Sequence, residues 1–203
     1  MKRLIIAIAG CLVGLSASAA ATPEGDVSEA AYQAWVTDNR MAAQVQAFEA
    51  HLASNGVAGV LPTYQILRTS SRWQACKATA FELPPRELWP NVLPVLRYIR
   101  TEVEPRIGRV QAVSGYRNPE LNGCSGGAKQ SAHRNYFALD LVPEAGLSRG
   151  ELIKEMCQVH RDKGQKGRIG LGFYSGVRFH LDSKRYRTWG ADGTGATSPC
   201  NGA

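Results

Sequence analysis

The chain has 203 residues, of which 44% are hydrophobic and 20% are charged. This length is enough for one domain with a substantial core and too short for two independent domains. The formal net charge is +7, a mild basic excess that suits an anionic partner, whereas the lack of a clustered basic run argues against nucleic-acid binding.

The first 21 residues have the organisation of a secretory signal peptide. Lys2 and Arg3 form a basic start, residues 4–15 an apolar run, and residues 17–21 a small-residue cleavage site. The run is too short for a stable membrane-spanning helix, and no later segment reaches the roughly 18 apolar residues that spanning requires. Cys11 ends a stretch that resembles a lipobox, but the apolar run continues past it, which disfavours lipid anchoring. We therefore expect an exported protein, periplasmic or secreted.

Four cysteines follow the signal segment, namely Cys76, Cys124, Cys157 and Cys200. An even number of cysteines in an exported chain favours two disulfides, and three connectivities remain open. No C-x-x-C pair occurs, so the spacing does not favour a cysteine zinc site.

The first part of the mature chain, residues 22–60, predicts a helical extension, followed by one domain over residues 61–203. Apolar residues recur mostly at three- and four-residue steps, which predicts one amphipathic helix over residues 28–54 that ends at Asn55-Gly56. A second apolar stripe predicts a helix from Pro90 to Glu104, stopped by Pro105.

The rest of the domain alternates between strands and short helices. Val110 to Ser114 predicts a strand, Asn118-Pro119-Glu120 a turn or short helix, and Tyr136 to Val142 the clearest strand. Ser148 and Glu151 form a capping-box signature for a helix that should end near Gly164. Three short strands should follow over residues 169–174, 177–182 and 185–189 as an antiparallel meander. The fold class is therefore α+β, with helices flanking one central antiparallel sheet.

Two histidines and one aspartate in this domain are candidate metal ligands. His133 precedes Asp140 by seven residues, and His180 follows forty residues later. Asp140 lies inside an otherwise apolar strand, where a metal ion would remove the cost of an unpaired carboxylate. Two imidazole nitrogens and one carboxylate oxygen can hold a tetrahedral zinc with its fourth position open. His51 and His160 lie in predicted helices without a carboxylate at a recognisable spacing, so we do not expect them to bind metal.

Three separated motifs make the chain resemble a known enzyme family. Ser131, His133, Ala138 and Asp140 match S-x-H-x-x-G-x-A-x-D, Ser114 to Pro119 is similar to S-G-Y-R-[ST]-P, and Phe179 to Asp182 is similar to F-V-H-x-D. These motifs are those of the zinc D-alanyl-D-alanine carboxypeptidases and dipeptidases, whose fold is shared with lysostaphin-type endopeptidases and the hedgehog signalling domain. The resemblance covers residues 110–189 and implies that fold for the whole segment.

The resemblance implies a role for each matching residue. His133, Asp140 and His180 would bind one Zn²⁺ ion, which lowers the pKa of its bound water. Arg117 would stabilise the oxyanion of the tetrahedral intermediate, the alternative being a structural ion pair. Ser131 would hydrogen-bond a substrate carboxylate or support a ligand.

Two departures from the family pattern concern the pocket and the general base. The glycine of the signature is replaced by Tyr136, which we expect to shape the floor or mouth of the pocket and to contact substrate. Family members commonly have an acidic residue three positions before the last ligand or a histidine two before it, but Val177 and Arg178 stand there. Asp182 is the nearest remaining carboxylate and our candidate base, although it could equally orient the last ligand or pair with Arg185.

The resemblance implies a zinc peptidase that acts on the peptide stems of peptidoglycan next to D-alanine, as a D,D-carboxypeptidase or endopeptidase. We expect a monomer, although nothing in the sequence determines the oligomeric state. The missing upstream base leaves open a zinc-containing binding module without turnover. A serine hydrolase is disfavoured because no G-x-S-x-G motif occurs, and the cysteines are better used in disulfides than as nucleophiles.

Overall fold

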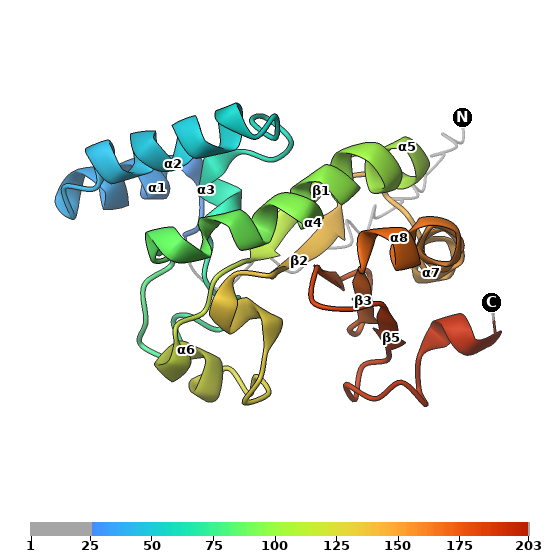
Figure 1. Ribbon diagram of the computed structural model, residues 1–203. Helices are drawn as coiled ribbons and strands as arrows, with labels where there is room; N and C mark the ends of the chain where they lie inside the picture. The colour runs from blue at the N-terminus through green and yellow to red at the C-terminus, as the bar shows by residue number, and fades with distance from the viewer. Residues whose placement is uncertain (1–25, 203) are drawn as a thin grey trace, which may run out of the picture.

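The computed structural model describes residues 26–202 (Figure 1). The signal-peptide interpretation and Cys11 fall outside these residues. Among the helices of the described part, none is both long enough and apolar enough to cross a membrane.

The N-terminal extension is a hairpin of two helices, so the single helix predicted over residues 28–54 is wrong. α1 (Glu29–Asp38) and α2 (Ala42–Ser54) run side by side, joined by a turn in which Arg40 has a φ of 54° (Figure 1). The side-chain amide of Asn39 donates to a carbonyl in the last turn of α1 at 2.8 Å, which satisfies the helix end at the break. The hairpin packs on the domain, with the ring centroids of Phe48 and Trp89 5.2 Å apart.

α3 (Thr63–Ile66) is followed later in the chain by one long helical segment. The sequence predicted that this helix stops at Pro105, but it continues to Ile107. It consists of the 3₁₀ helix η1 (Arg86–Val92), α4 (Leu93–Tyr98), the π-helical turn η2 (Ile99–Val103) and α5 (Glu104–Ile107). A proline inside an α-helix removes a hydrogen bond and clashes with the preceding turn. Here the wider π turn precedes Pro105, which then stands in the first turn of α5, where its missing N–H leaves no gap.

Five strands form one sheet in the order β1-β2-β4-β3-β5. They are β1 (Val110–Ser114), β2 (Ala138–Pro143), β3 (Gly170–Phe173), β4 (Phe179–Asp182) and β5 (Arg187–Trp189). The pairs β1–β2, β2–β4 and β4–β3 are antiparallel. The predicted meander would place β5 beside β4, but β5 pairs with β3 in parallel, because β2 already occupies the other edge of β4. The fold is α+β as predicted, with a mixed rather than purely antiparallel sheet.

Short helices connect the strands. α6 (Pro119–Cys124) begins after the capping residue Asn118, and η3 (Ala132–Asn135) leads into β2. α7 (Arg149–Val159) begins with the capping box predicted at Ser148 and Glu151. The same helical segment continues through η4 (His160–Gly164) and α8 (Gln165–Gly167), three residues beyond the predicted end. η5 (Pro199–Gly202) is the last element of the described part.

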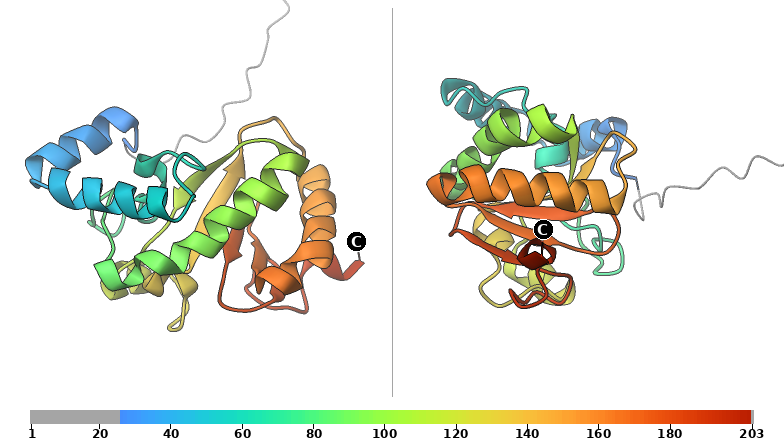
Figure 2. Two further views of the ribbon diagram at one scale, coloured as in Figure 1. Left: turned by 45° about the horizontal axis from the view of Figure 1, so that its top comes forward. Right: turned by 90° about the vertical axis from the view of Figure 1, so that its right-hand side faces the viewer.

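Helices cover one face of the sheet, and the core lies between these two layers (Figure 2). Fully buried side chains meet there, among them Val95, Ile99, Leu152 and Met156 from the helices and Leu139, Leu141, Leu171 and Leu181 from the strands. Because side chains alternate along a strand, Asp140 and His180 point to the opposite face. That face is free of the core helices and carries the candidate site.

Two disulfides use the four cysteines, as predicted, and select one of the three open connectivities. Cys76 pairs with Cys124 at the end of α6, and Cys157 in α7 pairs with Cys200 in η5. The bridged cysteines are 48 and 43 residues apart in sequence. Each bond therefore joins two segments that are far apart in the sequence, which restricts the unfolded chain.

Candidate metal centre

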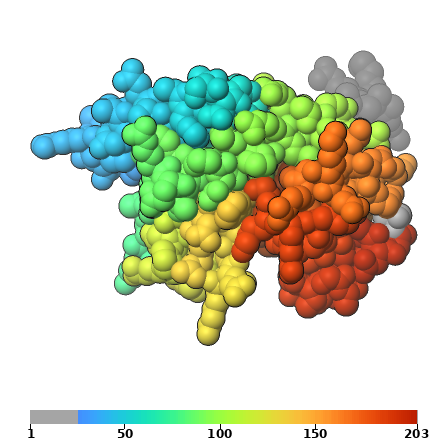
Figure 3. Space-filling view, in the orientation of Figure 1, coloured from blue at the N-terminus to red at the C-terminus, as the bar shows by residue number. Residues whose placement is uncertain are grey.

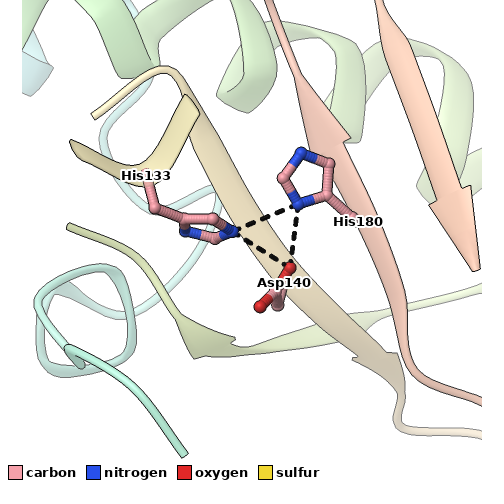
Figure 4. Close-up of side chains that lie close together, drawn as sticks. All are labelled: His133, Asp140 and His180. Atoms are coloured by element: carbon pink, nitrogen blue, oxygen red, sulfur yellow. Dashed lines mark hydrogen bonds and ion pairs between the residues drawn. The ribbon is translucent and has the colours of Figure 1, made fainter. Parts of the chain in front are cut away.

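The antiparallel pairing of β2 and β4 brings two of the predicted ligands together. Asp140 is the register partner of His180, so both side chains leave the same face of the sheet. His133 comes from η3, the turn before β2, and points toward both (Figure 4). No more than 4% of any of the three residues is exposed. The structure thus gathers all three predicted ligands in one buried cluster.

Three potential donor atoms converge in this cluster. Nε2 of His133 lies 3.1 Å from Nδ1 of His180 and 3.2 Å from Oδ1 of Asp140, and the latter two atoms are 3.0 Å apart. Bonds of about 2.0–2.1 Å around a tetrahedral zinc separate neighbouring donors by roughly 3.3 Å. The triangle therefore has nearly the dimensions of one face of such a site.

In each histidine, the ring nitrogen that faces away from the cluster, here called the outer nitrogen, is already hydrogen-bonded. These bonds determine whether the inner nitrogen, which faces the other two ligands, carries a hydrogen or a lone pair. Nδ1 of His133 lies 2.6 Å from the carbonyl oxygen of Gly115, which can only accept, so this nitrogen is the donor. Nε2 of His180 donates in the same way to Oδ2 of Asp182, at 3.1 Å. The inner nitrogens of the neutral rings are then lone pairs, and three acceptors face one another without a hydrogen between them. A cation satisfies such a set, so the residues fit a divalent metal such as zinc.

Asp140 is further bound by three neighbouring side chains. Nη2 of Arg117 lies 2.6 Å from its Oδ2, Arg178 donates to the same oxygen, and the hydroxyl of Tyr174 donates to Oδ1 at 3.0 Å. Burial alone would raise the pKa of Asp140, but His133 and Arg117 hold it well below its usual value. The carboxylate is therefore ionised, as a metal ligand must be.

The two histidines differ in basicity. Burial, assisted by the charge of Arg117, lowers the pKa of His133 to about 4, so its ring is neutral at neutral pH. Burial also acts to lower the pKa of His180, but its hydrogen bonds to Asp140 and Asp182 outweigh that effect and raise the pKa. Without a cation, His180 is therefore the member of the cluster that takes up a proton most readily.

The segment Ser114 to Arg117, which is part of the upstream motif, contacts two of the three candidate ligands. The carbonyl of Gly115 receives the His133 ring, and a Cβ at Gly115 would lie 2.6 Å from the carbonyl oxygen of Ile66, so only glycine fits. Oγ of Ser114 accepts from Nε of Arg117 at 3.0 Å, which directs the guanidinium toward Asp140. The motif therefore positions both a histidine and the aspartate. Arg117 forms a buried ion pair with Asp140 and also lines the cavity, so the ion pair does not exclude an oxyanion role.

The centre opens into a cavity of about 600 Å³. Figure 3 shows the hollow between the surface around η3, in yellow, and that of the C-terminal residues, in red. Its walls include His133, His180, Arg117, Ser131, Tyr174 and Trp189. Oγ of Ser131 accepts from the backbone N–H of His133 at 3.3 Å, so this residue caps η3 while lining the cavity.

Tyr136 is placed in the core, which corrects the expectation that it contacts substrate. Its side chain is fully buried, its hydroxyl donates to the carbonyl of Ile66 at 3.2 Å, and its ring centroid lies 6.3 Å from that of Phe48. Its φ of 58° lies in the left-handed region that favours glycine. A left-handed backbone at this position accounts for the glycine in the family signature, and the tyrosine here fills space in the hydrophobic core.

Asp182 is not placed to act as the general base. One of its oxygens bonds the outer nitrogen of His180, and Arg187 binds both oxygens, at 3.0 and 2.8 Å. Burial alone would raise its pKa, but His180 and then Arg187 lower the pKa to about 2, so it is a weak base. The alternative role, orienting His180, agrees with these contacts, and its ion-pair partner is Arg187 rather than Arg185.

Sequence reasoning missed Arg187 and Trp189, and treated Arg178 only as a missing base. The ring of Trp189 packs edge-on against that of His180, with centroids 4.7 Å apart. Both missed residues lie in β5 and reach the site only because β5 pairs with β3. The available signal was the pair Gly170 and Gly172 in β3, since glycines that alternate in a strand indicate the close approach of other groups.

The chain matches the model of a family described as peptidase M15 over residues 64–182, more than half of its length. The matched segment contains His133, Asp140 and His180, which form a group able to hold a metal ion within the described part. No curated protein and no solved structure matches the chain.

Proposed function

The chain belongs to the peptidase M15 family, and we propose that it is an exported zinc metallopeptidase that hydrolyses peptidoglycan stem peptides next to D-alanine, as a D,D-carboxypeptidase or an endopeptidase. The observation that carries this proposal is the cluster of three acceptor atoms at the base of an open cavity. The motif resemblance supports the choice of D-alanine-containing peptides.

His133, Asp140 and His180 would hold the zinc ion. When bound, zinc would supply a Lewis acid for the scissile carbonyl and would activate a water nucleophile. The chain itself holds both imidazoles by their outer nitrogens and keeps Asp140 ionised between two arginines. Such a preorganised centre needs little rearrangement when the metal binds.

The groups beside the centre can stabilise negative charge on the substrate. Arg117 and Arg178 share one carboxylate, so their pairing with Asp140 leaves one positive charge in excess at the cavity wall. That charge favours an oxyanion that develops on the peptide carbonyl. Burial and the charge of Asp140 raise the pKa of Tyr174, so its phenol stays protonated and keeps donating its one hydrogen to Asp140. Ser131 supplies a further hydroxyl on the same wall.

A second candidate function is a zinc-containing binding module without turnover. The observation that favours it is the lack of an evident base: Arg178 stands where a histidine is commonly found, and Asp182 is held by Arg187. Among the cavity-lining residues that the structure describes, Asp192 is the remaining carboxylate. The choice between the two functions therefore depends on whether the zinc-loaded protein turns over substrate.

Export is the remaining part of the proposal. It rests on the basic and apolar N-terminal segment together with the two disulfides, because disulfides persist in oxidising compartments. A peptidase in such a compartment would meet its peptidoglycan substrate directly.

Zinc content tests the metal centre. The mature protein should bind about one zinc per chain, and His133→Ala and His180→Ala should each lose it, because removing one of three protein ligands leaves an incomplete site. His51→Ala is the matched control and should keep full zinc content. The measurement is elemental analysis after dialysis against a weak chelator. Full zinc retention in His180→Ala would contradict the assignment.

Digestion of purified peptidoglycan tests the reaction. The zinc-loaded protein should release D-alanine if it is a carboxypeptidase, or convert crosslinked dimers to monomers if it is an endopeptidase, with products identified by mass. EDTA should abolish either product, and re-addition of zinc should restore it. No product from protein that demonstrably holds zinc would favour the binding module. With turnover established, its loss in Asp192→Asn with zinc retained would identify Asp192 as the base.

A further inference from the structure

We infer that Arg187 is a positioning residue for the metal centre: through Asp182 it holds His180 in the orientation that directs Nδ1 at the metal. The chain of contacts runs across three neighbouring strands, from β4 over β3 to β5. The inference rests on the proposed function only in taking His180 as a zinc ligand, and it does not require peptidase activity.

The contacts between the three residues are continuous. Nε2 of His180 donates to Oδ2 of Asp182 at 3.1 Å, and Arg187 donates to both oxygens of Asp182, with Nη2 at 2.8 Å and Nη1 at 3.0 Å. Such a two-point pair fixes the plane of the carboxylate as well as its position. The plane of Asp182 in turn fixes which nitrogen of His180 carries the hydrogen.

Burial makes the arginine necessary for this arrangement. The carboxylate of Asp182 is fully buried, whereas 29% of the Arg187 side chain is exposed at the cavity. A buried carboxylate without its cation would have to find another partner or leave its position. The backbone N–H of Lys184 donates to Oδ1 at 2.9 Å, but one amide does not replace a charged fork.

Gly170 provides the passage for this pair. A Cβ at Gly170 would lie 2.4 Å from Oδ2 of Asp182 and 2.8 Å from Nη1 of Arg187. The glycine therefore leaves open the space above β3 through which a side chain of β5 reaches one of β4. The parallel pairing of Gly170 with Arg187 sets the two in register.

Arg187 also supports the second contact to His180. Its guanidinium lies over the ring of Trp189, 4.8 Å from the centroid, and that ring packs against the His180 ring. Arg187 thus contacts both groups that hold His180. These are the Asp182 carboxylate, which accepts from Nε2, and the Trp189 indole, which packs against the imidazole ring. A residue with only a general structural role would not need both contacts.

The test compares Arg187→Met with Arg185→Met, which makes the same chemical change at an exposed arginine in the connection just before β5. Zinc affinity is measured by competition with a chromophoric chelator, and the His180 ring by ¹⁵N NMR of histidine-labelled, zinc-loaded protein. We expect Arg187→Met to bind zinc roughly 10-fold more weakly, and Asp182→Asn 10- to 100-fold, as for other groups that orient metal ligands. The Nε2 hydrogen of His180 should be protected from exchange in wild type and in Arg185→Met, and unprotected in Arg187→Met.

Arg187→Lys keeps the charge without the fork and should give an intermediate affinity, and it provides the same comparison if the methionine variant does not fold. The inference would be overturned if Arg187→Met had the same zinc affinity and the same Nε2 protection as Arg185→Met. If Arg187→Met does not fold, the same comparison is made with Arg187→Lys. Failure of wild type to bind zinc would instead remove the metal centre, and with it the proposed function. Lack of peptidoglycan turnover with the expected affinities would leave the inference standing.

Discussion

Gly172 faces His180 across the ladder between β3 and β4, and the ring of Trp189 occupies the space that a side chain would fill. A Cβ at Gly172 would lie 2.1 Å from that ring. We therefore expect Gly172→Ala to displace Trp189 from His180 and to lower the free energy of unfolding by about 1–3 kcal/mol, as overpacking does elsewhere. Zinc affinity should fall as well. Urea unfolding and zinc competition measure the two effects.

Gly150 provides the matched control for that substitution. It lies in the first turn of α7, and a Cβ there would meet nothing within 4 Å. Gly150→Ala should leave zinc affinity unchanged and raise the free energy of unfolding by up to about 1 kcal/mol, because alanine favours the helix. Equal effects of the two substitutions would show that the space at Gly172 is not what matters.

Single residues were predictable where residue chemistry and a family resemblance agree. His133, Asp140 and His180 could be chosen from the sequence because few residue types bind zinc, an aspartate in an apolar strand needs a partner, and the three motifs resemble those of a zinc peptidase family. Tyr136 and Asp182 could not be assigned in the same way. The role of Tyr136 depends on a backbone angle, and that of Asp182 on an arginine two strands away. Neither the backbone angle nor the contact with a distant arginine can be predicted from the residues next to Tyr136 and Asp182 in the sequence.

At the scale of elements, the capping box of α7 makes stability depend on pH. Oε2 of Glu151 accepts from the backbone N–H and the hydroxyl of Ser148, at 2.9 and 2.7 Å, and these bonds lower the pKa of Glu151 from its usual 4.5. A lowered folded-state pKa stabilises the protein above the unfolded value, and the contribution is lost as pH falls through the folded value. Glu151→Gln should therefore be less stable than wild type at neutral pH, and this difference should vanish in acid.

Urea unfolding of both proteins between neutral pH and about pH 3 measures that difference. Ser148→Ala provides a second readout, with an expected loss of about 1 kcal/mol at neutral pH, since it removes the cap itself. A difference between wild type and Glu151→Gln that stays constant down to the lowest pH would contradict the assignment.

Elements were predictable where a local signal marks their ends, and not where a distant strand decides. The caps at Ser148 and Asn118 gave the starts of α7 and α6. The break at Arg40 was hidden, because apolar residues continue on both sides of it and the turn uses neither glycine nor proline. The position of β5 depends on which edge of the sheet is free, a property of the whole sheet that periodicity along one strand does not contain.

At the scale of the molecule, the two disulfides have different relations to the cavity. Cys76–Cys124 joins the segment around Ser70 to the end of α6, where the hydroxyls of Ser70 and Ser125 are 2.9 Å apart and both residues line the cavity. Cys157–Cys200 joins α7 to η5. The loop between β5 and η5, residues 190–198, lines the cavity on this side. It has hydrogen bonds of its own, such as the one from the N–H of Gly190 to the carbonyl of Thr194, at 3.1 Å.

We therefore expect the paired serine variants to differ in function more than in stability. Chain separations of 48 and 43 residues predict similar losses, about 4 kcal/mol each, because a crosslink restricts the unfolded chain according to loop length. The proposed turnover of peptidoglycan, once it is established for wild type, is measured at a temperature where both variants are folded. It should fall in Cys76→Ser/Cys124→Ser, whose cavity wall is released, and remain close to wild type in Cys157→Ser/Cys200→Ser. An equal loss of turnover in both would mean that the C-terminal wall depends on its disulfide as strongly as the opposite wall does.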